Sequence, residues 1–169
     1  NDVVDRYINL SERNMDYQKD GYIDLEQVRD KEYLSKIFKK IRILDSNNAP
    51  RETFPMLSSI KIEVVLENTE NFPGMDYGIS IETPMGQRIT SFATWMLKEK
   101  IRVPEKILLV IPKIMFSSGS YRINLSMTHP KEGTYIDKVL SAASFNVEAT
   151  DIFNTGRPFD SDYGLLIPD

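Results

Sequence analysis

The segment 119–128 reads Gly-Ser-Tyr-Arg-Ile-Asn-Leu-Ser-Met-Thr, and from Tyr121 onward its apolar and polar side chains alternate at every step. The apolar members are Tyr121, Ile123, Leu125 and Met127, and the polar members are Arg122, Asn124, Ser126 and Thr128. A period of two residues indicates a β-strand with one face in a core and the other face toward water or a ligand. The functional question is therefore what the polar face of a sheet binds.

Most of the other apolar runs repeat this pattern and are separated by turn-forming residues. The expected strands are 37–44, 56–68, 75–83, 87–95, 106–112 and 139–150. Because the residues from Ile107 to Ile111 are apolar on both faces, we expect 106–112 to be central in a sheet or covered by another element. Seven or eight short strands predict an all-β fold, a two-sheet antiparallel sandwich of jelly-roll or immunoglobulin-like type.

The first 36 residues have a different pattern. Apolar residues at spacings of three and four predict a short amphipathic helix over 2–17, and 19–36 contains an Asp20-Gly21 turn and is expected to be a linker. We therefore expect a helical segment and linker over 1–36 and a sandwich over 37–169. Since the chain begins with Asn1 rather than Met, we expect it to be a fragment of a longer protein.

Composition excludes several classes of partner. The chain has 169 residues, of which 41% are hydrophobic and 27% charged, which fits one globular domain. Its net charge of −4 argues against nucleic acid, because binding to phosphates needs a basic surface. Cysteine is absent, so there is no disulfide or thiolate metal site, and this is compatible with a reducing cytoplasm.

Catalytic motifs are also missing. His129 is the single histidine, no nucleophile elbow accompanies any serine, and a zinc site would need more histidine or cysteine. A third, minority hypothesis is a glycosidase with converging carboxylates, for which the candidates are Asp76, Glu82, Asp160 and Asp162. Because Asp160 and Asp162 lack the regular calcium-binding loop, we expect a polar turn there and no metal site.

Several motifs occur in an order and spacing that is similar to one family. They are Ile43-Leu44-Asp45, a long strand ending in Glu67-Asn68, YGISIETPMGQRI at 77–89, a hydrophobic strand ending in Ile111-Pro112, SGSYRINLSM at 118–127 and SFNVEATD at 144–151. Over 37–169 the chain resembles the C-terminal carbohydrate-binding domain of Wzt-type nucleotide-binding subunits. These subunits belong to ABC transporters that export O-antigen polysaccharides.

The resemblance implies that the domain recognises the end of a lipid-linked O-antigen polysaccharide at the cytoplasmic face of the bacterial inner membrane. It implies an upstream ATPase domain that uses ATP and Mg. No phosphate-cradling Gly-rich loop occurs in these residues, so we expect no cofactor in this piece. It also implies two protein partners: the transmembrane permease subunit, through the full-length chain, and a second copy in a homodimer. Family members can exchange C-terminal strands, and the matching residues are Gly164, Leu165, Leu166 and Ile167.

Sugar recognition needs an apolar platform for the C–H face of a ring and planar or bidentate polar groups for its hydroxyls. Our candidate carbohydrate-binding residues are Arg88, Trp95, Arg122, Asn124, His129 and Tyr135. The pattern favours a core or hinge aromatic for Trp95 and an exposed turn residue for His129 over sugar binding, and both are kept as candidates. The alternative function is a structural or protein-interaction sandwich that docks a partner through a sheet edge, which would show a long apolar edge or patch.

Overall fold

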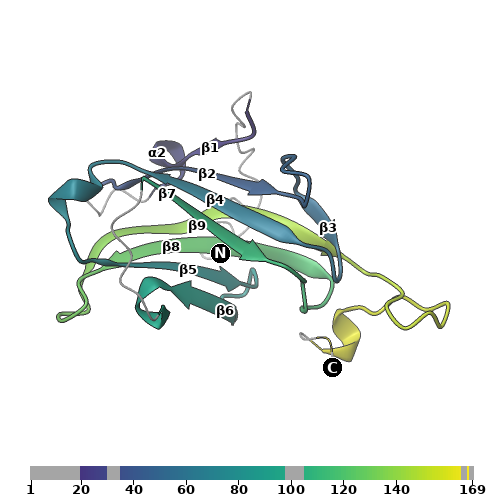
Figure 1. Ribbon diagram of the computed structural model, residues 1–169. Coiled ribbons are helices and arrows are strands. Elements are labelled where there is room, and N and C mark those ends of the chain that lie inside the picture. The colour runs from purple at the N-terminus through teal and green to yellow at the C-terminus, as the bar shows by residue number, and fades with distance from the viewer. Residues whose placement is uncertain (1–19, 30–34, 98–104, 165–166, 168–169) are drawn as a thin grey trace, which may run out of the picture.

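The computed structural model describes residues 20–29, 35–97, 105–164 and 167, and these form two stacked β-sheets (Figure 1). The four-stranded sheet has the order β1-β2-β4-β7 and the five-stranded sheet has the order β3-β9-β8-β5-β6. The first sheet contains β1 (Ile23–Asp24), β2 (Phe38–Leu44), β4 (Ile60–Leu66) and β7 (Lys106–Ile111). The second contains β3 (Thr53–Pro55), β5 (Asp76–Glu82), β6 (Arg88–Ala93), β8 (Gly119–Thr128) and β9 (Tyr135–Glu148). The predicted all-β sandwich is confirmed.

Helical structure is limited to single turns in the described residues. They are α2 (Leu25–Val28) and the 3-10 turns η1 (Thr69–Asn71), η2 (Thr94–Met96) and η3 (Ser161–Tyr163). None of the described helices is long and apolar enough to cross a membrane. The strand pairs are antiparallel except for β3, which runs parallel to β9.

The strand β8 lies inside the five-stranded sheet and has the bounds that the alternating pattern predicts. It pairs with β5 on one side and with β9 on the other. Its apolar residues, from Tyr121 to Met127, are buried between the sheets, and its polar residues are half-buried on the outer face. Facing residues of the other sheet, such as Ile41 and Ile62, complete the core. The period of two thus separates core from surface, as β-geometry requires.

The strand β7 differs from the prediction for 106–112. Among the described strands it pairs with β4 alone and so forms an edge of the four-stranded sheet. Its inward residues, Ile107 and Leu109, pack against the core, whereas Leu108 is 52% and Val110 46% exposed. The apolar residues on both faces therefore mark an edge with an apolar outer surface, and not a central or covered strand.

Residues 20–29, which the sequence analysis assigned to a linker, are packed on the sandwich. β1 pairs with β2 through Ile23 and Ile41, and Leu25 is completely buried in the core. Asp24 caps the following turn, because its carboxylate accepts a hydrogen bond from the Glu26 N–H at 3.0 Å. The helix predicted over 2–17 lies outside the described residues.

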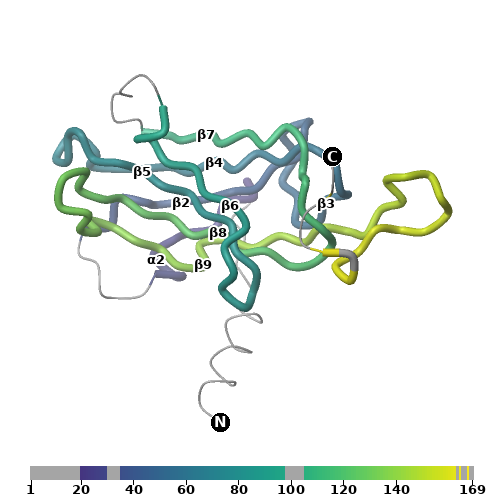
Figure 2. The backbone as a smooth tube through the Cα atoms, turned by 90° about the horizontal axis from the view of Figure 1, so that it is seen from below, coloured from purple at the N-terminus to yellow at the C-terminus, as the bar shows by residue number. Residues whose placement is uncertain are grey.

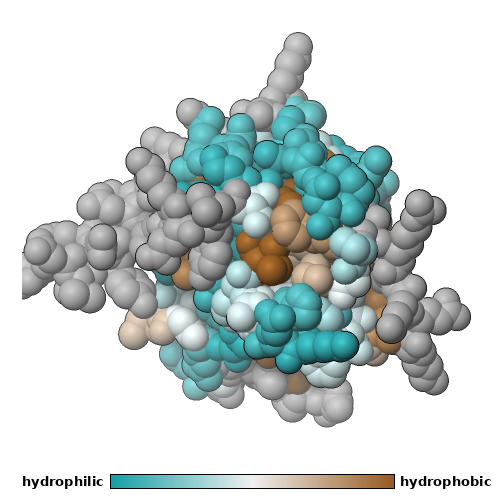
Figure 3. All heavy atoms as spheres, turned by 90° about the vertical axis from the view of Figure 1, so that its left-hand side faces the viewer, coloured by the Kyte–Doolittle hydropathy of each residue, from teal (hydrophilic) through white to brown (hydrophobic). Residues whose placement is uncertain are grey.

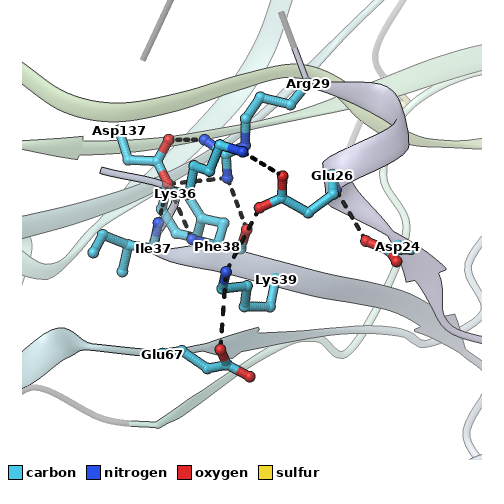
Figure 4. A network of polar contacts seen from close by, with 9 residues as sticks. All are labelled: Asp24, Glu26, Arg29, Lys36, Ile37, Phe38, Lys39, Glu67 and Asp137. Atoms are coloured by element: carbon cyan, nitrogen blue, oxygen red, sulfur yellow. Dashed lines mark hydrogen bonds and ion pairs between the residues drawn. The ribbon is translucent and has the colours of Figure 1, made fainter. Parts of the chain in front are cut away.

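A buried ion pair attaches this segment to the opposite sheet (Figure 4). Asp137, on the inner face of β9, is fully buried and forms a salt bridge with Arg29. The same carboxylate accepts hydrogen bonds from the backbone N–H groups of Ile37 at 2.6 Å and Phe38 at 3.0 Å. Arg29 also donates to the Phe38 carbonyl at 2.8 Å. One carboxylate therefore connects β9 to the start of β2 and to the end of α2.

The C-terminal residues considered for strand exchange are described only in part. Ile167 is buried and its N–H donates to the Met115 carbonyl at 2.8 Å, within the same chain. Gly164 ends η3, and Leu165 and Leu166 lie outside the described residues. Strand exchange stays a prediction.

Candidate functional site

The strands β8, β5 and β6 are neighbours in the five-stranded sheet, whose backbone is seen from below in Figure 2. Their outward positions carry small and polar side chains. The strand registers place them in three rows. They are Arg88, Glu82 and Arg122; Ser91, Ser80 and Asn124; and Ala93, Gly78 and Ser126. We call these nine residues the polar band. Since adjacent strands lie about 4.8 Å apart, the band is about 10 Å wide.

The charged row of the band places two arginines on the strands that flank one glutamate. Arg88 Nη2 lies 3.1 Å from Glu82 Oε1, and Arg122 occupies the position across from Glu82 on β8. A register shift between Ile81 and Glu82 turns Arg88 to the same face as Ser91, while Phe92 pairs with the buried Ile79. Guanidinium groups present several donors in a fixed plane, which suits pairs of hydroxyls or an anionic group on a sugar.

The middle row contains Asn124, whose side chain holds an irregularity of β9 in place. Ile123 pairs with Ala143 and Leu125 with Val139, so three residues of β9, 140–142, lie opposite the single residue Asn124. Ser141 has a φ of 49°, in the left-handed region, and its N–H donates to Asn124 Oδ1 at 2.8 Å. Asn124 Nδ2 lies 3.5 Å from Ser80 Oγ. Asn124 thus has a structural role within the candidate site.

We predict that Asn124→Ala lowers the free energy of unfolding by about 1–2 kcal/mol, because the half-buried Ser141 N–H loses its acceptor. Urea denaturation measures this change. The matched control is Ser126→Ala, on the same face of the same strand, which should change stability by less than about 0.5 kcal/mol. Equal effects of the two substitutions would contradict the role of Asn124 as the support of this bulge.

The other sequence-predicted residues lie away from the charged row. Tyr135 pairs with Thr128, six residues along β8 from Arg122, which corresponds to about 20 Å. Its half-exposed ring has Lys138 Nζ 4.5 Å from the centroid. His129 lies in the adjacent turn, where its backbone bonds to Gly133 and Thr134. These two residues therefore belong to a separate end of the sheet.

Trp95 is neither a core residue nor a strand residue. It lies in η2, directly after β6, and its side chain is 67% exposed. The neighbouring Thr94 fixes this turn, since its hydroxyl accepts from the Tyr77 N–H at 2.9 Å and donates to Asp76 at 3.1 Å. The face thus brings together Arg88, Arg122 and Asn124 but not the whole predicted set.

Sequence reasoning missed Gly78 and Ser80, which β5 contributes to the band, and considered Glu82 only as a catalytic carboxylate. Gly78, Ser80 and Glu82 alternate with the buried Tyr77, Ile79 and Ile81, so the same period of two that identified β8 marks them. Gly78 is also tightly placed, because a Cβ atom built on it would lie 2.7 Å from Ser126 Oγ. What the sequence did not provide was the register that aligns β5 with β8.

The glycosidase hypothesis is wrong for the pair on β5. Asp76 and Glu82 are at opposite ends of this strand, about 20 Å apart, whereas glycoside hydrolysis needs carboxylates about 5–9.5 Å apart. Asp160 accepts a hydrogen bond from the Asp162 N–H at 3.0 Å, as a polar turn does. No group of metal-binding side chains occurs within the part of the chain that the structure describes.

A second charged cluster lies on the outer face of the four-stranded sheet, centred on Glu63. Its carboxylate accepts from the Tyr22 hydroxyl and from Arg42 Nε at 2.8 Å, and Lys106 Nζ lies 3.3 Å away. Burial raises the pKa of Glu63, but the hydrogen bond from Tyr22 and the charges of Arg42 and Lys106 outweigh it and hold the pKa below its ordinary value. Because protein donors already surround Glu63, this cluster joins strands and is a poor ligand site.

A protein of known structure, the C-terminal domain of Wzt, shares this architecture. No curated protein matches the chain. A solved structure described as the C-terminal domain of Wzt superimposes with a TM-score of 0.57 at 18% identity, and the match covers 94% of each chain. The PmoD soluble domain from Methylocystis sp. gives a TM-score of 0.41 at 11% identity, covering 64% of this chain and 89% of that one. The family model for the Wzt C-terminal domain matches residues 37–160, more than half of the chain. The chain therefore belongs to the Wzt C-terminal domain family.

Proposed function

We propose that this chain binds the terminal part of a lipid-linked O-antigen polysaccharide, without catalysis, and that the polar band is the binding surface. Membership of the Wzt C-terminal domain family supports a non-catalytic role in an O-antigen-related transporter. The observation that carries the proposal is the row of Arg88, Glu82 and Arg122 beside small side chains.

The chemistry of the band suits a flat polar ligand. The third row of the band has only short side chains, Ala93 on β6 and Ser126, whose Oγ lies over Gly78 of β5, so a sugar ring can approach the sheet closely. The hydroxyls of Ser80 and Ser91 and the guanidinium group of Arg122 supply both donors and acceptors for sugar hydroxyls. Since these contacts replace contacts with water of similar strength, the expected affinity is modest.

Recognition is useful to an exporter only if it is coupled to transport. We propose that an ATPase domain precedes this chain in the full-length protein and that the chain acts as a homodimer. Its partners would then be the polysaccharide and the transmembrane permease subunit, at the cytoplasmic face of the inner membrane. The family assignment supports this arrangement.

The test is a titration of this chain with the producing strain's own O-polysaccharide and with one of different terminal structure, followed by NMR. We expect saturable binding of the cognate glycan, and at least about tenfold weaker binding by Arg122→Gln, because a charge-assisted hydrogen bond contributes about 1.5–3 kcal/mol. Arg157→Gln is the matched control, since Arg157 is an exposed arginine away from the band, between β9 and η3. If neither Arg88→Gln nor Arg122→Gln changes the affinity for the glycan, the polar band is not the binding surface.

A second candidate function is docking of a protein partner through a sheet edge. It is favoured by the apolar outer surface of β7, where Leu108 and Val110 are exposed at an edge strand. Leu108→Lys separates the two functions, because it should weaken protein docking and leave glycan binding intact. If the cognate glycan does not bind to the folded chain, this second function becomes the better hypothesis.

A further inference from the structure

The strand β7 is an edge strand without the features that usually keep an edge from pairing. Natural proteins protect sheet edges with very short strands, proline and bulges. β1 has two residues, β3 has three and ends in Pro55, and β6 has a register shift near Glu82 and ends at the turn η2. β7 has six residues without proline, pairs with β4 without a register shift, and has its one charged residue, Lys106, at its start. Among the described edges, β7 is therefore the one best suited to accept another strand.

The free side of β7 presents the backbone groups of alternate residues. The Glu105 carbonyl accepts the Leu66 N–H at 2.8 Å, so the backbone groups of the odd-numbered residues of β7 point toward β4. Those of the even-numbered residues, Lys106, Leu108 and Val110, point to the free side, where none of the described strands pairs with them. The side chains of the same three residues lie on the outer face of the sheet and are about half exposed.

Exposed apolar side chains gather on this side of the molecule. An apolar cleft of about 380 Å³ lies between β7 and the end of β6. Figure 3 shows hydrophobic surface at one end of the molecule, between hydrophilic side chains above and below. Of the ten large hydrophobic residues that are exposed in the described part of the chain, six lie on β7 or along β6 and η2: Phe92, Trp95, Met96, Leu97, Leu108 and Val110. Single exposed apolar residues are ordinary, but such a group marks an interaction surface.

A second copy of this chain fits the edge in one register. If two β7 strands run antiparallel about a two-fold axis at Leu108, this residue faces its own copy and Lys106 faces Val110 of the partner subunit. Every free backbone group of β7 then has a partner, and no like charges lie opposite each other. A register centred on Leu109 instead places Lys106 opposite Pro112, which has no N–H. A shift in the other direction places Val110 opposite a residue outside β7.

We propose that two copies of this chain associate through β7, edge to edge and antiparallel, so that their four-stranded sheets form one continuous sheet. The occupant is a second copy because the edge is complementary to itself about a two-fold axis, the commonest symmetry of protein oligomers. The same axis places the exposed apolar side chains of β6 and η2 beside those of the partner. This inference rests on the homodimer proposed above and gives it an interface, but it does not depend on glycan binding.

Cysteine cross-linking tests the register, since the chain has no cysteine of its own. In the proposed pairing the two Leu108 Cα atoms lie about 5.5 Å apart, within disulfide range. Leu108→Cys should therefore form a disulfide-linked dimer under mild oxidation. Val110→Cys is the matched control on the same face of β7, because its two copies would lie about 14 Å apart and should cross-link at least about tenfold more slowly. A mixture of Lys106→Cys and Val110→Cys should cross-link, although neither variant does so alone.

Sedimentation velocity tests the association without cross-linking. We expect a dimer for the unsubstituted chain. Leu108→Lys places two ammonium groups opposite each other at the axis and should weaken dimerisation at least about tenfold. Leu140→Lys is the control, since Leu140 is a similarly exposed leucine on β9, and it should leave dimerisation unchanged.

The possible failures can be told apart. A chain that is monomeric throughout would overturn both this interface and the homodimer. A dimer in which Leu108→Cys cross-links no faster than Val110→Cys would be held by another surface, such as residues 164–167, and would overturn the β7 interface alone. Glycan titration is a separate measurement, so its failure would leave the cross-linking result as it is.

Discussion

Asp137→Asn should lower the free energy of unfolding by about 3–5 kcal/mol, because it leaves Arg29 as a buried charge without its counter-ion. Both side chains are nearly inaccessible, at 3% exposed for Arg29 and 0% for Asp137. The same carboxylate accepts the N–H groups of Ile37 and Phe38, so the substitution also weakens the attachment of β2 to β9 (Figure 4). Urea denaturation followed by circular dichroism measures the loss.

Two further variants show whether the loss comes from the buried pair. One is a control at an exposed carboxylate, and the other removes both buried charges. Glu148→Gln neutralises an exposed carboxylate on the same strand and should change stability by less than about 0.5 kcal/mol. The double variant Arg29→Met with Asp137→Leu removes both charges and should recover part of the loss, but not all, because two backbone N–H groups still lack an acceptor. A loss below about 1 kcal/mol for Asp137→Asn would contradict this account.

Phe145→Ala should lower the free energy of unfolding by about 3–5 kcal/mol, because it removes the central ring of an aromatic cluster in the core. The Phe145 ring lies 5.6 Å from Tyr121, 6.0 Å from Phe54 and 6.2 Å from Phe116, measured between centroids. These three neighbours come from β3, β8 and the segment before β8, so the space left by the ring cannot be filled by one local shift.

Phe153→Ala tests whether burial, and not the loss of an aromatic ring, causes this effect. Phe153 is 55% exposed in the chain after β9 and contacts Phe159 with a centroid distance of 6.1 Å. Its removal should cost less than about 1 kcal/mol. Similar midpoints for the two variants in thermal or urea denaturation would show that Phe145 is not central to the core.

The alternating segments were sufficient to predict seven of the described strands, β2 and β4 to β9, and the buried faces of β4, β5 and β8, whereas the short strands β1 and β3 were not expected. The bounds of β8 agree with its pattern, and β4 and β5 bury the expected residues, Ile60 to Leu66 and Tyr77 to Ile81 at alternate positions. This works because the two faces of a strand are fixed by its own backbone, independent of its neighbours. The order of motifs likewise identified the family that the comparison shows.

The candidate site could be predicted only in part. Arg122 and Asn124 were identified because they lie on the polar face of β8, but Glu82 and Ser80 join them only through the pairing of β5 with β8. The residue type of Asn124 also did not reveal its structural role. Its amide oxygen accepts the Ser141 N–H in a bulge of β9, and the alternating pattern of the sequence does not predict this bulge. Tyr135 and His129 were grouped with the arginines because their side chains suit sugar binding. In the structure they lie at the opposite end of β8 from Arg122.

The sequence by itself determined that this chain forms strands, which face of each strand is apolar, and which family it resembles. Only the tertiary structure decided that β7 is an edge strand, that residues 20–29 pack on the sandwich, and that Asp137 is paired with Arg29 across the two sheets. The physical reason is the range of the interactions. The alternation of side chains is local, whereas strand order, register and burial of a charge depend on residues far apart in the chain.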